Sequence, residues 1–102
     1  MTDLWTWGGE YIGRREGNDL WSHNGKHIGR FYGDEVYGRD GRYLGEILSQ
    51  RHLITNQSKK HLNRGSFTPH MSRIGWVPFV PYVGNVMYVG YEDFPSLNQL
   101  EA

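Results

Sequence analysis

Residues 19–46 read DLWSHNGKHIGRFYGDEVYGRDGRYLGE, and this stretch decides the fold. Asn24-Gly25 and Asp40-Gly41 are strong hairpin signals, because a type I′ turn needs positive φ at both central residues. Gly33-Asp34 between them suits another two-residue turn. The intervening segments are short and rich in aromatic and β-branched residues, as strands are. Since every connection is tight, neighbouring strands must be antiparallel.

The same pattern recurs every sixteen residues through residues 3–50. It predicts a single all-β domain over 1–102, an antiparallel meander of short hairpins with clear units at 3–18, 19–34 and 35–50 and a degenerate fourth at 51–95. Strands are expected near 3–7, 10–16, 19–23, 26–32, 35–39, 42–48 and 51–55. The aligned positions are Gly9, Gly25 and Gly41; Gly13, Gly29 and Gly45; and Trp5, Trp21 and Tyr37.

The second glycine column falls inside the expected strands, where glycine costs roughly 0.5–1 kcal/mol relative to alanine. A cost repeated at Gly13, Gly29 and Gly45 indicates a shared purpose. Either each glycine marks a kink or bulge, or another backbone or an aromatic ring approaches closely there. The sequence leaves both explanations open.

The pattern decays after residue 50. Residues 56–73 are polar and basic without a clear period, which predicts a loop. Residues 74–94 are apolar, but Pro78, Pro81 and Gly84 interrupt them, so a transmembrane helix is excluded. Residues 86–89 are expected to form one more short strand. The tail is expected to complete the fourth unit or to cover the open end of the sheet, with 96–102 frayed or in a helical turn.

The composition excludes several classes of protein. At 102 residues a single domain is expected, and 15% aromatic residues argue against disorder. The absence of cysteine excludes disulfides, thiolate metal sites and cysteine nucleophiles. The start, Met1 to Trp5, lacks the basic and apolar regions of a signal peptide, so a cytoplasmic location is expected.

The succession NGKHIGR, DGRYLGE, RHLI, a basic linker and a closing GYEDF resembles the bacterial 4-fold β-flower domain family. The resemblance implies hairpin petals with internal pseudo-fourfold symmetry, and it implies no established activity or catalytic residues. The fourth unit departs from the family pattern because it lacks the glycine pair. The strand pattern is also similar, more weakly, to that of the PRC barrel.

The formal net charge of zero hides a basic middle. Residues 47–91 carry five Lys or Arg and no acid, so Lys59, Lys60, Arg64 and Arg73 are candidate contacts for phosphate or nucleic acid. The alternative is a solvated loop whose charge is balanced by the acidic ends of the chain.

Aromatic side chains suggest a second binding mode, through stacking on a partner protein or a sugar. The alternative is that these rings fill the gaps between glycine-rich hairpins. Self-association is a further expectation, because an incomplete fourth unit leaves a strand edge. The candidate interface residues are Trp7, Trp21, Tyr32, Tyr37 and Tyr43.

No motif points to catalysis, a cofactor or a resident metal. His23 and His27 flank a two-residue turn and project from opposite faces, and His52, His61 and His70 have no acidic neighbours in the sequence. No nucleophile elbow or phosphate-binding loop is present. The leading expectation is a non-catalytic protein-interaction module without membrane contact. The alternatives are a phosphate-contacting module and a small enzyme with its site on the pseudosymmetry axis.

Overall fold

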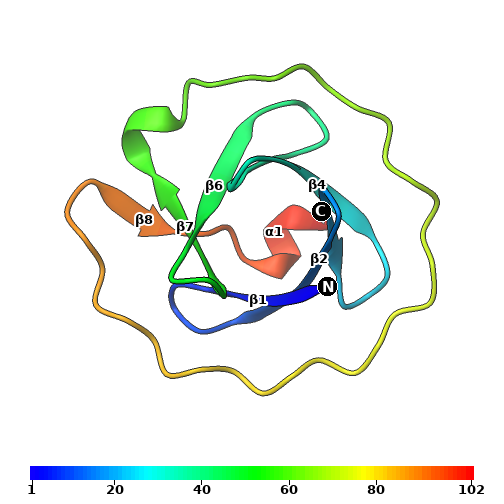
Figure 1. Ribbon diagram of the computed structural model, residues 1–102, viewed down its shortest axis with the longest axis horizontal. Helices are drawn as coiled ribbons and strands as arrows, with labels where there is room; N and C mark the ends of the chain where they lie inside the picture. The colour runs from blue at the N-terminus through cyan, green and yellow to red at the C-terminus, as the bar shows by residue number, and fades with distance from the viewer.

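The computed structural model describes all of residues 1–102 and is nearly all β (Figure 1). Each of the seven predicted strands is present, with ends within two residues of the expectation. An eighth strand, one turn of 3-10 helix (η1) and one turn of α-helix complete the secondary structure. The elements are β1 (Thr2–Thr6), β2 (Tyr11–Glu16), β3 (Asp19–Ser22), β4 (His27–Tyr32), β5 (Glu35–Tyr37), β6 (Tyr43–Leu48), β7 (His52–Asn56), η1 (Gln57–Lys59), β8 (Tyr91–Asp93) and α1 (Leu97–Leu100).

Strands β1 to β7 form an antiparallel meander that closes on itself like a barrel. The closing pair, β1 and β7, is parallel, because an odd number of alternating strands brings the first and last into the same direction. Trp5 pairs with His52 and Thr6 with Leu53, and the Trp5 amide donates to the Arg51 carbonyl at 2.8 Å. Closure removes the free sheet edges that β1 and β7 would otherwise present.

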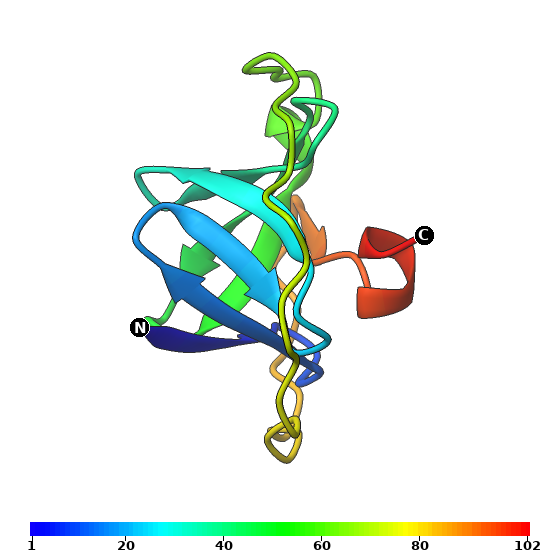
Figure 2. The same ribbon diagram turned by 90° about the vertical axis from the view of Figure 1, so that its right-hand side faces the viewer.

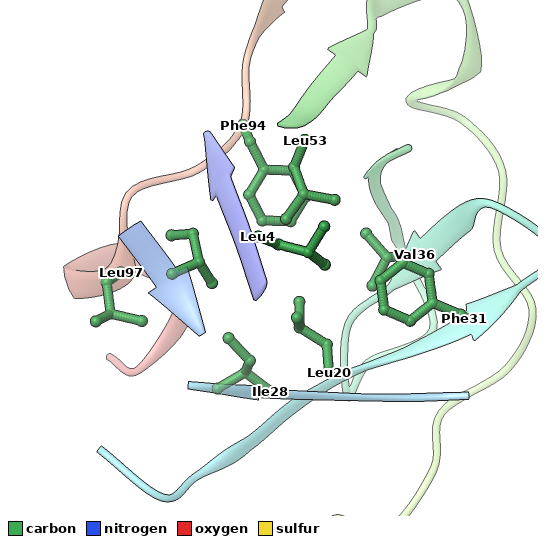
Figure 3. Close-up of a cluster of buried hydrophobic side chains, with 9 residues drawn as sticks. Leu4, Leu20, Ile28, Phe31, Val36, Leu53, Phe94 and Leu97 are labelled. Atoms are coloured by element: carbon green, nitrogen blue, oxygen red, sulfur yellow. The ribbon is translucent and has the colours of Figure 1, made fainter. Parts of the chain in front are cut away.

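The barrel interior is filled by apolar side chains from the meander (Figure 3). Phe94 and Leu97 from the C-terminal segment belong to the same buried cluster. Helix α1 therefore lies over one end of the barrel, as Figures 1 and 2 show from two directions. The meander contributes Leu4, Ile12, Leu20, Ile28, Phe31, Val36 and Leu53.

The C-terminal tail pairs with the sheet and covers one end of the barrel. Strand β8 pairs with β7, placing Asp93 opposite Ile54, and residues 97–100 form a capped helical turn. The Ser96 hydroxyl accepts from the Gln99 amide, and the Gln99 side chain accepts from the Ser96 amide in return. The expected strand at 86–89 is wrong: pairing with β7 begins only at Tyr91, beyond the Gly90 turn.

Both explanations of the strand glycines apply. The register shifts place β-bulges at Ile12, Ile28 and Leu44, each directly before one of these glycines. There is also no room for a side chain. A Cβ on Gly13 would overlap the Trp21 carbonyl, and a Cβ on Gly45 would lie 2.6 Å from the Phe94 ring. Glycine is therefore required where a bulged strand meets its neighbour at close range.

Residues 64–90, here called the belt, run as an extended chain around the outside of the barrel (Figure 1). Edge-on, the belt follows a narrow band, with α1 to one side of it (Figure 2). The molecule is accordingly disc-shaped, with extents of 37 × 33 × 23 Å. Neither helical segment has the length and apolar character needed to cross a bilayer.

Candidate interaction surface

The sequence of the belt repeats every three residues, which is neither the period of two of a strand nor the period of 3.6 of a helix. Its sequence divides into RGS FTP HMS RIG WVP FVP YVG NVM YVG. The first position is an arginine or a ring in all triplets but one, the second is mostly β-branched, and the third is mostly Pro, Gly or Ser. A period of three is that of the polyproline II helix. The prediction that residues 56–73 lack a period is therefore wrong from residue 64 onward.

The first positions of the triplets face the barrel, and six of the nine bind the turns of the meander through their amides. Arg73 N donates to Gly25 O at 2.9 Å, and Trp76 N donates to His23 O at 2.8 Å. Equivalent pairs of bonds occur nine belt residues earlier and nine later, on turns that lie sixteen residues apart. These are Arg64 N to Gly41 O, Phe67 N to Arg39 O, Tyr82 N to Gly9 O and Asn85 N to Trp7 O. Successive hairpins of the barrel therefore bind parts of the belt that lie three triplets, or nine residues, apart.

Side chains at the first position stack on the aromatic column of the barrel. The Arg73 guanidinium lies 3.8 Å from the Trp21 ring centroid, and Arg64 lies 5.6 Å from that of Tyr37. Tyr82 stacks on Trp5 with 4.3 Å between centroids. Cation–π and ring–ring contacts of this kind contribute about 0.5–2 kcal/mol each when partly desolvated. The belt is therefore held by backbone hydrogen bonds and by stacking at every hairpin.

The turn glycines are needed for this docking. Gly25 has a φ of 83°, which already favours glycine, and a Cβ there would overlap the Arg73 carbonyl. At the other end of the barrel, Gly33 has a φ of 64° with nothing within 4 Å of a Cβ. Gly25 and Gly33 therefore have similar backbone conformations, but only Gly25 lies against the belt.

His27, His70 and Asp19 form the only cluster with metal-ligand geometry, with ligand atoms within 4.8 Å of one another. The donor set does not fit a divalent cation. His27 Nδ1 accepts from the His70 amide at 2.9 Å, so in the neutral ring Nε2 carries the proton and has no lone pair to give. Nε2 lies 2.9 Å from Asp19 Oδ1, at an angle poor for a hydrogen bond. Burial lowers the pKa of His27, which keeps the ring neutral.

The second position of the triplets faces away from the barrel. Seven consecutive second positions are apolar, and their exposures range from 79 to 101%. The largest apolar patch on a monomeric protein is typically about 300–600 Å² and is often functional. We call this set the rim row: Met71, Ile74, Val77, Val80, Val83, Val86 and Val89. The segment that carries these residues runs in Figure 1 from the yellow-green right-hand side, round the lower edge, to the orange left-hand side.

The four candidate phosphate-binding residues all make intramolecular contacts. Lys59 lies 2.9 Å from both Glu35 and Glu46, and Lys60 lies 3.1 Å from Glu92. Arg73 pairs with Glu16 while it covers Trp21, and Arg64 covers Tyr32 and Tyr37. The acids that balance the basic middle come from the first hairpins and from the tail. These contacts favour the solvated-loop alternative over a phosphate-binding face.

Lys59 acts as a clamp at the start of the belt. It joins η1 to β5 and β6 through Glu35 and Glu46, whose carboxylates also accept from the Tyr37 and Tyr43 hydroxyls at 2.9 and 2.7 Å. The hydrogen bond from Lys59 lowers the pKa of Glu35 below its ordinary value of 4.5. The two carboxylates raise the pKa of Lys59.

This clamp predicts a loss of stability in acid. A carboxyl whose pKa is depressed on folding stabilises the protein above its unfolded pKa, and this contribution is lost as the pH falls through the folded pKa. The free energy of unfolding should therefore decline below pH 4.5, and Glu35→Gln should flatten that decline. Urea denaturation across this range measures it, with Asp34→Asn, whose carboxylate is 77% exposed, as the control. An unchanged slope in Glu35→Gln would exclude this role for the clamp.

The candidate aromatic interface is not an exposed patch. Four of its five residues are buried, because the belt and neighbouring rings cover them, and only Tyr32, at 36% exposure, reaches the surface. The Trp7 indole, for example, donates to the Val86 carbonyl of the belt at 3.0 Å. The buried four, Trp7, Trp21, Tyr37 and Tyr43, thus fill gaps, which was the alternative. Sequence reasoning missed the rim row, although the triplet spacing could have revealed it.

Fold and surface together define a closed, seven-stranded all-β barrel wrapped by an extended segment with an apolar outer row. Comparison with known proteins found no match to a protein-family model, a curated protein or a solved structure.

Proposed function

We propose that this protein is a non-catalytic interaction module that binds a partner protein through the rim row. The observation that carries this proposal is the set of seven apolar side chains held outward on a hydrogen-bonded belt. Full burial of one such side chain contributes about 2.5 kcal/mol, which at about 25 cal/mol per Å² corresponds to about 100 Å² of apolar surface. The seven side chains of the rim row therefore offer about 700 Å² together. A stable interface buries about 800 Å² on each partner.

The curvature of the rim indicates the shape of that partner. Row residues lie about 9 Å apart along a polyproline II path. On a disc 37 Å by 33 Å, a flat or convex surface meets about three of them, or roughly 300 Å², which is well below a stable interface. A concave apolar surface that follows the rim can cover all seven. The proposed partner is therefore a protein that surrounds this edge, rather than a bilayer or a second copy.

The alternatives have less support. The four candidate residues, Lys59, Lys60, Arg64 and Arg73, face carboxylates or aromatic rings, so they do not form a free cationic surface that would favour phosphate. The barrel axis is occupied by the buried cluster, which leaves no room there for an enzyme site.

We further propose that the hairpins are copies of one sixteen-residue unit, arranged with pseudo-fourfold symmetry as in the β-flower resemblance. Three bulges at matching places and three matching sets of belt contacts support this, with β7 and β8 as the fourth pair. The bacterial and cytoplasmic setting stays a prediction.

The experiment places a photo-crosslinking residue at Ile74 or at Val86, near the two ends of the rim row, in the cells that make the protein. Both positions are expected to give an adduct of the same mass. The control position is Asp34, which follows Gly33 in a turn at the end of the barrel away from the belt. Ile74→Asp and Val86→Asp should each remove the other position's adduct while changing the free energy of unfolding by less than about 0.5 kcal/mol.

Three results would contradict the proposal. A shift to dimers with concentration in sedimentation would assign the row to a second copy. Flotation with anionic lipid vesicles, lost in Val80→Asp, would assign it to a membrane. Adducts absent from both row positions would show that the row binds no protein.

A further inference from the structure

A cavity lies where the belt passes the start of the barrel, and the proposed docking on the rim row does not use it, although Val80 of that row is among its lining residues. Its volume is about 690 Å³, within the usual range for small-ligand sites. Aromatic and apolar groups form much of the wall, from Trp5 of β1 and from Phe79, Val80 and Tyr82 of the belt. The lining also contains two charged side chains, Asp3 and Arg51.

The two charges differ in their partners. The Asp3 carboxylate accepts from the Tyr11 hydroxyl at 2.7 Å and lies 3.5 Å from Arg14 Nε, so its charge is compensated. Arg51 makes no ion pair. Its only side-chain hydrogen bond is a donation from Nη1 to the Tyr82 hydroxyl at 3.3 Å. The uncompensated charge in this cavity is therefore positive.

The Tyr82 hydroxyl hydrogen and the remaining N–H groups of the Arg51 guanidinium have no acceptor within the protein. Because Arg51 donates to Tyr82 Oη, the Tyr82 hydroxyl hydrogen points elsewhere, and no protein group accepts it. The Trp5 indole N–H is not a further free donor in this cavity, because it already donates to the Val80 carbonyl at 3.0 Å. A guanidinium and a hydroxyl side by side, both with free hydrogens, match the two oxygens of a carboxylate.

We propose that this cavity binds a carboxylate that carries an aromatic or bulky apolar group. The carboxylate accepts from Arg51 and from the Tyr82 hydroxyl, and the apolar group lies against Phe79 and the exposed face of the Tyr82 ring. Both a free small acid and the C-terminal residue of a peptide have this chemistry. The inference does not depend on the rim row.

The test titrates the full chain with four probes by calorimetry. Phenylacetate and N-acetyl-phenylalanine carry the carboxylate, one as a small acid and the other as the end of a peptide. The neutral counterparts are 2-phenylethanol and N-acetyl-phenylalanine amide. At least one acid is expected to bind saturably and at least tenfold more tightly than its neutral counterpart. The pattern across the two acids identifies the source of the ligand.

Variants assign the binding to these two residues. Arg51→Gln should remove the tenfold preference, and Tyr82→Phe, which keeps the stack on Trp5, should weaken acid binding severalfold. Arg42→Gln, an exposed arginine outside the cavity, should leave binding unchanged. The proposal is overturned if neither acid binds saturably, if the neutral probes bind equally well, or if Arg51→Gln binds as the wild type does.

Discussion

Gly25→Ala is expected to lower the free energy of unfolding by about 3–5 kcal/mol, whereas Gly33→Ala should cost only about 1 kcal/mol. The two glycines have similar positive φ values, 83° and 64°, so the backbone strain of alanine is comparable at both sites. Only at Gly25 does the new methyl group overlap the belt, at the Arg73 carbonyl.

The difference between the variants therefore measures belt docking at one hairpin. To admit the methyl group, the belt must give up the Arg73 and Trp76 hydrogen bonds and the stack on Trp21. Urea denaturation of both variants measures the two losses. Equal losses would mean that the belt contributes no stability at this turn. Gly9→Ala, where the Tyr82 carbonyl occupies the equivalent place, repeats the test on another hairpin.

Phe94→Ala is expected to destabilise the protein by about 3–5 kcal/mol, as large truncations in a packed core do. Phe94 is buried in the cluster that fills the barrel, and its ring lies against Gly45, where no side chain fits. Removing the ring leaves a cavity between the barrel and the C-terminal segment. The resulting loss should also release α1.

Phe94→Leu keeps most of the apolar volume and should cost less than about 1.5 kcal/mol. Leu100→Ala, on the less buried side of α1, is the matched truncation and should cost less than Phe94→Ala. A loss below about 1 kcal/mol for Phe94→Ala would show that the tail only rests against the barrel.

The meander could be predicted from the sequence because its signals are local. Asn24-Gly25 and Asp40-Gly41 mark the places of their turns from the local sequence, and the strands follow from them. The expected type I′ conformation is wrong, because only the glycine of each pair has positive φ and its amide closes the turn onto the carbonyl of Ser22 or Gly38. Closure of the barrel could not be predicted in this way. The parallel pairing of Trp5 with His52 joins residues far apart in the chain, and no turn sets its register.

The belt was missed because its pattern belongs to neither regular element. Alternation by two indicates a strand and a period near 3.6 indicates a helix, but the belt repeats every three residues with proline or glycine in many triplets. Its apolar residues therefore looked like an interrupted core segment. In the structure, Trp76 faces the barrel while Ile74 and Val77 face solvent, so one apolar run serves two surfaces.

The candidate residues were chosen by chemical type, and contacts distant in sequence decided their roles. Lys59 is cationic as expected, but Glu35 and Glu46 meet it from two other strands. Trp21 is large and aromatic as an interface residue would be, but Arg73 covers it from the belt. Neither partner can be identified from the local sequence.

Amide hydrogen exchange along the belt tests its docking most directly. The amides of Arg64, Phe67, His70, Arg73, Trp76, Tyr82 and Asn85 donate to the barrel, whereas those of Ile74, Val77, Val80, Val83 and Val86 have no protein acceptor. The first group should exchange at least about tenfold more slowly than the second, giving protection with a three-residue period. Uniformly fast exchange from residue 64 to residue 89 would contradict a docked belt and the outward rim row that depends on it.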